Sequence, residues 1–258
     1  MKTVCKNCHQ QFKGNYCNNC GQSADTHEIN SRYLWHTIEH GVFHVDKGII
    51  HTTKELFTRP GHAIREYIAG KRITHFNPFT YIIILSTVYA LLAHFLHVQI
   101  FFDTISTDMS GAEKLKENET FQIMMSILFW VKDHYEYSTL FLIPAFSLAS
   151  YMAFRKSGYN YLKHFILNSY LAGQRIVVFI IALPFLALIK NKNVVSTVED
   201  IETIIWISLM TWTYIQFFDN NKIFKNILRT LLSYVYLVIL LMIILIALGL
   251  SIASSFAK

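Results

Sequence analysis

The sequence predicts an all-α polytopic membrane protein of about five transmembrane helices, with a small N-terminal zinc ribbon and amphipathic interfacial helices. Hydrophobic residues make up 53% of the 258 residues and charged residues only 16%, which departs from the usage of soluble proteins. All four cysteines fall within the first 20 residues, so thiol chemistry is confined to the head of the chain. We therefore divide the chain into a zinc ribbon at 1–22, a linker with cytoplasmic interfacial helices at 23–77, and a transmembrane domain at 78–258.

The cysteines form two pairs, Cys5-x-x-Cys8 and Cys17-x-x-Cys20, each with the spacing of a metal-binding turn. Eight intervening residues let the second pair fold back on the first, and four sulfur ligands then complete a tetrahedron, which favours structural zinc. Iron, or His9 in place of one thiolate, is the alternative. Two disulfides are disfavoured because we expect a reducing cytoplasmic setting. A closed four-ligand site has no open position for catalysis, so the metal would stabilise a segment too short to fold alone.

Apolar stretches that follow predict the membrane spans. The first has 24 residues without Asp, Glu, Lys or Arg, enough at about 1.5 Å per residue to cross a hydrocarbon core of about 30 Å. Asn77 is expected to cap this helix and Pro78 to begin it. Two stretches are short, so four crossings is the alternative to five, and a shorter run at 121–131 is expected to be interfacial or re-entrant. The predicted spans are 79–102, 138–154, 165–189, 201–218 and 231–253.

Lysine and arginine are distributed unevenly around these spans. Sixteen precede the first span or lie between the second and third or the fourth and fifth, against six in the other loops and the tail. The positive-inside rule then places the N-terminus in the cytoplasm. The N-terminus is polar, whereas a cleavable signal peptide has an apolar core, so we expect the first span to be the internal targeting element.

The stretch RPGHAIREYIAGKRITHFNP, just before the first span, predicts a short amphipathic helix. Pro60 suits its first turn and Gly70 the residue after its last turn, giving a helix of about ten residues. Ile64, Tyr67 and Ile68 then share one apolar face, as in a helix that lies along a surface.

Four cations of this stretch, Arg59, Arg65, Lys71 and Arg72, are called the collar here. Near the headgroup plane each would gain about 1 kcal/mol from an anionic leaflet. Two interpretations stay open. In the first, the collar binds a lipid phosphate or a diphosphate through its guanidinium groups. In the second, the collar only fixes the topology and anchors the chain.

One cation, Arg175, lies inside the third span, roughly 15 Å from its cytoplasmic start. A charge at that depth costs a few kcal/mol, so we expect it to face a partner, a cavity or a bound anion. Snorkelling of the side chain to the surface is the alternative. A polar seam on the same helix would run inward beside it, and Gly173 would permit close helix packing. The polar residues of the seam are Asn168, Tyr170 and Gln174.

Histidines and loop acids supply further candidate groups. On a helix, His36, His40 and His44 form one ladder, which is either a solvated face or part of a metal site. Glu39, Asp46 or His51 would contribute an oxygen or nitrogen ligand to such a site. Further candidates for metal or acid/base chemistry are His51, His94, His97, Asp133, His134 and Glu136.

A cysteine head that ends in YCNNCGQ is followed by DKGIIHTTKELFTRPGHAIREYIAGKR and then by apolar spans. This order resembles domain-of-unknown-function family 3667 over roughly the first 80 residues. The resemblance implies a protein of the bacterial cytoplasmic (inner) membrane with a cytoplasmic N-terminal ribbon, and it implies no catalytic residue. The residues that carry it are Cys5, Cys8, Cys17, Cys20, Gly21, Gln22, Asp46, Gly48, Thr53, Leu56, Pro60, Gly61, Arg65, Glu66, Tyr67, Gly70, Lys71, Arg72 and Pro78.

Two functions therefore compete. The first is a zinc-ribbon adaptor or scaffold that binds a protein partner through the ribbon and anionic lipid at the cytoplasmic face. The second is an enzyme or small carrier for phosphorylated lipid, in which the collar and Arg175 hold the headgroup. No Gly-rich phosphate loop, Ser-His-Asp arrangement or zincin helix supports a familiar mechanism. A histidine-based haem or di-metal oxidoreductase and nucleic-acid binding are both disfavoured.

Overall fold

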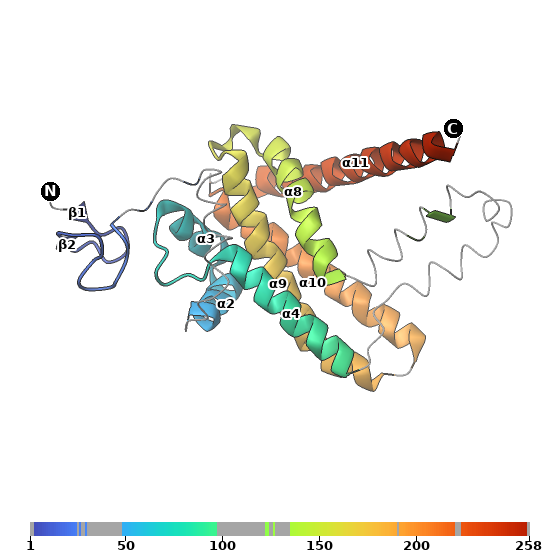
Figure 1. Ribbon diagram of the computed structural model, residues 1–258, viewed down its shortest axis with the longest axis horizontal. Coiled ribbons are helices and arrows are strands. Elements are labelled where there is room, and N and C mark those ends of the chain that lie inside the picture. Colours follow the sequence, from blue (N-terminus) through green and yellow to red (C-terminus); the bar gives the residue numbers. More distant parts are fainter. Residues whose placement is uncertain are drawn as a thin grey trace.

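The computed structural model describes residues 3–24, 26, 29, 48–96, 122, 123, 126, 135–189, 191–219 and 223–256. This part of the chain is mostly helical (Figure 1), with a short 3-10 turn, η2 (Arg155–Ser157), after the second predicted span. Two strands, β1 (Thr3–Val4) and β2 (Gln11–Phe12), pair antiparallel in the N-terminal head. The helices are α2 (Gly48–Thr58), α3 (Pro60–Ala69), α4 (Pro78–Phe95), α8 (Tyr135–Ala153), α9 (Tyr161–Leu188), α10 (Lys192–Phe217) and α11 (Ile223–Phe256).

A helix covers most of the described part of each of the five predicted spans, and residues 97–102 of the first lie outside the described residues. Three of them, α4, α9 and α11, are long and apolar enough to cross a membrane, which suggests a membrane protein. In α8 the apolar part is limited to Leu140–Ala153, and α10 carries three acids in its first half. The described residues thus contain three candidate spans, and the count of five stays a prediction. Most of the run at 121–131 lies outside the described residues.

Local sequence signals set the ends of α3 and α4 as predicted. Pro60 lies in the first turn of α3, and Gly70 ends the helix in the left-handed region at φ +107°. The Asn77 side chain accepts a hydrogen bond from the Phe79 amide at 2.9 Å, which caps α4 ahead of Pro78.

Two glycines let helices approach closely. A Cβ at Gly61 would lie 2.3 Å from the backbone nitrogen of Phe217, so α3 abuts the end of α10. A Cβ at Gly173 would lie 2.5 Å from the Tyr81 ring, which confirms the expected close packing of α9, here against α4. The apolar face of α3 is covered by these neighbours, since Ile64 is 0% exposed. That face, which indicated a surface helix, is therefore turned into the bundle.

One end of the bundle gathers the ends of several helices. The ring of Phe154, after α8, stacks on Phe218, after α10, with 3.8 Å between centroids. Tyr159, which precedes α9, lies 4.6 Å from Phe217. Helix α3 packs on the end of α10, and α4 begins just after α3. Because the collar cations flank or belong to α3, we call this end of the bundle the collar end. Helices α8, α9 and α10 thus run in alternating directions, whereas α11 lies across them and extends away from the others (Figure 1).

Candidate metal centre, collar and buried arginine

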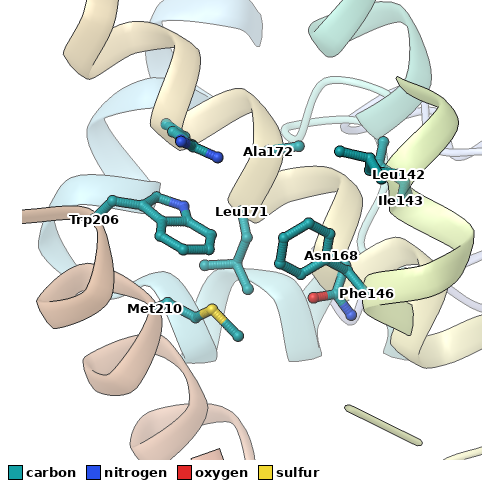
Figure 2. Close-up of a pocket in the computed structure, with 9 residues that line it drawn as sticks. Leu142, Ile143, Phe146, Asn168, Leu171, Ala172, Trp206 and Met210 are labelled. Atoms are coloured by element: carbon teal, nitrogen blue, oxygen red, sulfur yellow. The ribbon is translucent and has the colours of Figure 1, made fainter. Parts of the chain in front are cut away.

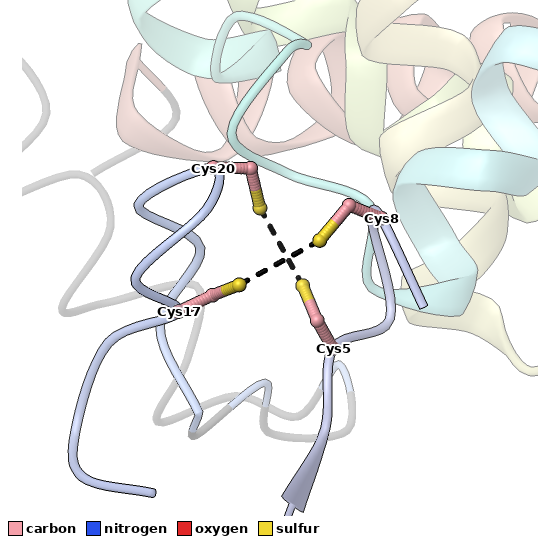
Figure 3. A group of neighbouring side chains, drawn as sticks. All are labelled: Cys5, Cys8, Cys17 and Cys20. Carbon is pink, nitrogen blue, oxygen red and sulfur yellow. Dashed lines mark hydrogen bonds between the residues drawn. The ribbon is translucent and has the colours of Figure 1, made fainter. Parts of the chain in front are cut away.

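The four cysteine sulfurs converge in the head, as the sequence predicts (Figure 3). Each offers a sulfur within 4.8 Å of the others, with 3.5 Å between Cys5 and Cys20 and 3.6 Å between Cys8 and Cys17. His9 lies outside this group. Four sulfurs at such distances fit a tetrahedral metal site, and the geometry does not by itself select the ion.

Backbone turns of the same kind hold each cysteine pair. The amide of His9 donates to the carbonyl of Cys5 at 2.9 Å, and the amide of Gly21 donates to that of Cys17 at 2.8 Å. Each turn directs two sulfurs to the shared centre.

The two cysteines of the first pair lie in different electrostatic environments. Hydrogen bonds, first from the Asn19 side chain and then from the Gln10 backbone, lower the pKa of Cys8 to about 6. Burial raises the pKa of Cys5 to about 11. A bound cation would stabilise the thiolate of the buried member, because the metal's charge opposes the cost of burying an anion. The donor set therefore fits a metal such as zinc.

Two collar cations are paired with carboxylates of α2 and α3. Arg59 forms ion pairs with Glu55 and, at 3.2 Å, with Glu66, and Lys71 lies 3.4 Å from Glu66. Burial alone would raise the pKa of Glu66, but the hydrogen bond and charge of Arg59, with Lys71, hold that pKa below its ordinary value. The positive charges of this half of the collar are therefore compensated within the protein.

The other two collar cations also contact protein. Arg65 donates to the carbonyl oxygens of Gln216 and, at 3.1 Å, of Phe217, which the end of α10 leaves without helical partners. It also lies 3.4 Å from a carboxylate oxygen of Asp219. The Arg72 guanidinium stands 5.7 Å from the centroid of the Tyr67 ring. Arg59 and Lys71 thus share Glu66, Arg65 contacts the end of α10 and Arg72 lies near Tyr67, so the four collar cations are not gathered around one group.

Arg175 lines a small cavity between α8, α9 and α10 (Figure 2). The guanidinium lies 4.6 Å from the Trp206 ring centroid and 5.1 Å from that of Phe179, and the Glu202 carboxylate is within its electrostatic range. The cavity measures about 40 Å³, room for roughly three water molecules. The collar cations are not among its lining residues, which are Leu142, Ile143, Phe146, Asn168, Leu171, Ala172, Arg175, Trp206 and Met210.

The predicted polar seam of α9 exists, and its side chains join helices to one another. The Asn168 amide donates to Ser150 Oγ at 2.9 Å, and Tyr214 donates its hydroxyl proton to Asn168 Oδ1 at 2.9 Å. Tyr170 donates to the carbonyl of Phe76, and Gln174 to that of Leu56, both at 2.7 Å. These bonds tie α9 to α8, α10, α2 and the residues before α4.

Two residues at these sites, His164 and Glu202, were not singled out from the sequence, and Gln22 was named only as part of the family resemblance, without a contact. Gln22 bonds the linker between α3 and α4, His164 bonds Ser150 inside the bundle at 3.0 Å, and Glu202 lies near Arg175. For Gln22 its place directly after the second cysteine pair was the available clue. For His164 and Glu202 the partners are distant in sequence, and no local pattern marks them.

The structure leaves the remaining candidates untested. The ladder and its proposed acidic ligands lie outside the described residues, as do three further candidates; these residues are His36, Glu39, His40, His44, Asp46, His97, Asp133 and His134. The Glu136 side chain is not described either, although its backbone belongs to α8. His94 is exposed near the end of α4, and His51 packs edge to face against His75.

Together these features define a class of protein: a helical, membrane-type bundle that carries a four-cysteine head beside its collar end. The family model described as "Protein of unknown function (DUF3667)" matches residues 46–90, from just before α2 to within α4. The match confirms the family resemblance in the segment that holds the collar, and it does not include the cysteine head. No curated protein and no solved structure matches the chain.

Proposed function

We propose that this chain is a membrane scaffold of the bacterial inner membrane that holds a zinc-loaded head on the cytoplasmic side. The head presents a surface to a protein partner, and the collar end rests on anionic lipid. The observation that carries the proposal is the convergence of four cysteine sulfurs within 4.8 Å, in a head attached at the start of the first candidate span.

Five crossings with a cytoplasmic N-terminus are supported by the arrangement of the helix ends. Helices α8, α9 and α10 alternate in direction, and the cations that follow α8 and begin α9 and α11 lie at the collar end, whereas Lys192 begins α10 at the opposite end (Figure 1). The first half of α10 points away from that end and is acidic, with Glu199, Asp200 and Glu202. This asymmetry is what the positive-inside rule requires if the collar end is cytoplasmic. The cations at the collar end are Lys54, Arg59, Arg65, Lys71, Arg72, Arg155, Lys156, Lys163, Lys225 and Arg229.

At the collar end, anionic lipid binds mainly to the cations whose side chains remain exposed to solvent. Arg155 and Lys156 are exposed on η2, and Lys54 and Lys225 are exposed on α2 and α11. Cations near an anionic leaflet gain about 1 kcal/mol each, provided that carboxylates do not already neutralise them. Because Arg59 and Lys71 share Glu66, we assign the larger share of lipid binding to the exposed group.

The alternative, an enzyme or carrier for phosphorylated lipid, has one observation in its favour: Arg175 lines a cavity. That cavity has about 40 Å³ and no collar cation in its lining, so it does not fit a headgroup held by both. Gln174, the neighbour of Arg175, bonds the backbone of α2. If α2 is cytoplasmic, Arg175 lies near the membrane boundary, where an arginine needs no ligand. The scaffold is therefore the better supported function.

Metal analysis of the full-length chain in detergent tests the zinc site. We expect one zinc per chain, lost in Cys17→Ser, whose substitution removes one of the four sulfurs, and retained in His9→Ala. Iron in place of zinc, or no bound metal, would overturn the assignment. Labelling with a membrane-impermeant maleimide tests orientation, since the only cysteines of the chain lie in the head. After chelation, inverted vesicles should label and intact spheroplasts should not.

Native mass spectrometry of the same preparation tests lipid binding. The double variant Arg155→Gln and Lys156→Gln should retain less anionic lipid than the wild type, whereas Arg59→Gln should change retention less. Equal retention in all three proteins would contradict the assignment of lipid binding to the exposed cations.

A further inference from the structure

Gln22 connects the cysteine head to the linker between α3 and α4. Its side-chain oxygen accepts hydrogen bonds from the backbone amides of Arg72 at 3.1 Å and Ile73 at 2.9 Å. The Gln22 side chain is 4% exposed, and the two hydrogen bonds are partly buried. Amides at this position follow the end of α3 and precede α4, where neither helix supplies them with a carbonyl.

The position of Gln22 depends on the second cysteine turn. The Gln22 carbonyl accepts from the amide of Cys17 at 2.8 Å, and Gln22 itself lies two residues after Cys20. A second contact comes from the first turn, where Lys6 donates to the Thr26 carbonyl at 3.2 Å. A Cβ at Gly70 would lie 2.8 Å from Lys6 Cδ, so the Lys6 stem covers the end of α3. Each of the two cysteine turns therefore places one side chain, Lys6 or Gln22, against the residues that join α3 to α4.

The head has little else to hold these turns together. Its buried core consists of Cys5, Phe12 and Cys17, and its two strands have two residues each. A segment of this size does not maintain such turns without a ligand, because the entropy of ordering them exceeds what so small a core returns. Loss of the metal would therefore release Gln22.

We propose that Gln22 couples the metal state of the cysteine head to the linker that leads into the first candidate span. With metal bound, the Gln22 side chain holds the amides of Arg72 and Ile73, and the head is docked on the collar end. Without metal, or with the thiols oxidised, the head unfolds and the linker is released. The head therefore docks on the collar end only while it holds a metal. This inference rests on the proposed metal site.

Hydrogen–deuterium exchange of the full-length chain in detergent tests the coupling, with metal content measured in parallel. In the wild type, removal of metal by a chelator should accelerate exchange in a peptide that covers Arg72 and Ile73 by roughly three- to tenfold, the value of a hydrogen bond. In Gln22→Ala the same peptide should exchange fast with and without chelator. Peptides from the head should stay protected in the metal-loaded variant, because its four cysteines are intact.

Gln11→Ala, a glutamine exposed on β2 of the same head, is the matched control and should behave as the wild type. Unchanged linker protection in metal-loaded Gln22→Ala would overturn the coupling, as would unchanged protection after the wild type has lost its metal. A wild-type chain that binds no metal would overturn the coupling and the proposed metal site together. If the chain binds zinc but the exchange of the Arg72–Ile73 peptide does not depend on it, the coupling is wrong and the proposed metal site is still supported.

Discussion

The cysteine head and the helical bundle are stabilised by different means. The head has three buried apolar residues and brings its four cysteine sulfurs within 4.8 Å of one another. The bundle buries large rings such as Tyr81, Tyr170 and Phe154, and two glycines set its closest helix contacts. The stability of the head should therefore depend on a bound ligand, and the stability of the bundle on the packing of its buried side chains. Substitutions that disturb one should leave the other intact, apart from the contacts that Gln22 and Lys6 make between them.

The largest effect is expected in the head. Cys17→Ser removes one of the four sulfurs of the proposed zinc site, and a structural zinc contributes about 10 kcal/mol or more to the folding of small domains. We expect the variant to lose its metal and the protection of residues 5–20, while the melting temperature of the bundle falls little. Metal analysis and thermal unfolding followed by helical circular dichroism measure the two parts separately. A large drop in the bundle transition would show that the two parts are not independent.

The bundle should respond most to a methyl group at Gly61. A Cβ there would lie 2.3 Å from the amide nitrogen of Phe217 and 2.5 Å from the carbonyl carbon of Gln216, and backbone atoms cannot move aside cheaply. Overpacking of this kind costs about 1–3 kcal/mol or more. Gly61→Ala should lower the free energy of unfolding in mixed micelles and leave the metal content unchanged.

Gly249→Ala is the matched control, because a Cβ at Gly249 meets nothing within 4 Å. Alanine is the better helix former by up to about 1 kcal/mol, so this variant should be as stable as the wild type or slightly more so. Equal destabilisation at both positions would mean that the close approach of α3 and α10 is not what Gly61 provides.

The features that the sequence predicted are those set by local chemistry. Pro60, Gly70 and Asn77 determine helix ends through their own backbone and side-chain geometry, and the spacing of the cysteines determines the two turns that bring the sulfurs together. Apolar composition likewise marked where the long helices would lie. Such information is contained in a few consecutive residues.

The partners of the polar residues could not be predicted, because they are distant in the chain. Arg65 bonds the end of α10 across 151 positions, and Gln22 bonds Arg72 across 50. From sequence alone, the collar was a set of like charges facing lipid. The structure places a carboxylate or a helix end against three of its four members. A single sequence gives the charge of a side chain, but it does not give the tertiary contact that uses it.

A smaller effect is expected from the polar seam inside the bundle. Tyr214→Phe leaves Asn168 Oδ1 without its 2.9 Å donor in a buried site. Interhelical hydrogen bonds in membrane proteins contribute about 0.5–2 kcal/mol, so the free energy of unfolding should fall by that amount. Tyr16→Phe, at a ring 69% exposed in the head, should have no effect on the bundle. Indistinguishable stabilities would argue that the seam is not a structural connection.

The smallest effect concerns the ion pairs of Glu66. Its folded-state pKa is below its ordinary value of about 4.5, so its stabilisation is fully present above pH 4.5 and is lost as the pH falls through the folded-state pKa. The Glu66 side chain is 28% exposed and that of Arg59 is 43% exposed, so solvent limits the contribution to about 1 kcal/mol at most. The measurement belongs in the Cys17→Ser background, where metal binding no longer adds its own pH dependence. There, Glu66→Gln should lower stability at pH 7 and flatten the decline below pH 4.5, whereas Lys54→Gln, at an exposed cation, should keep that decline. An unchanged acid limb in Glu66→Gln would mean that the collar pairs form without stabilising the bundle, and that the collar charges remain available to lipid.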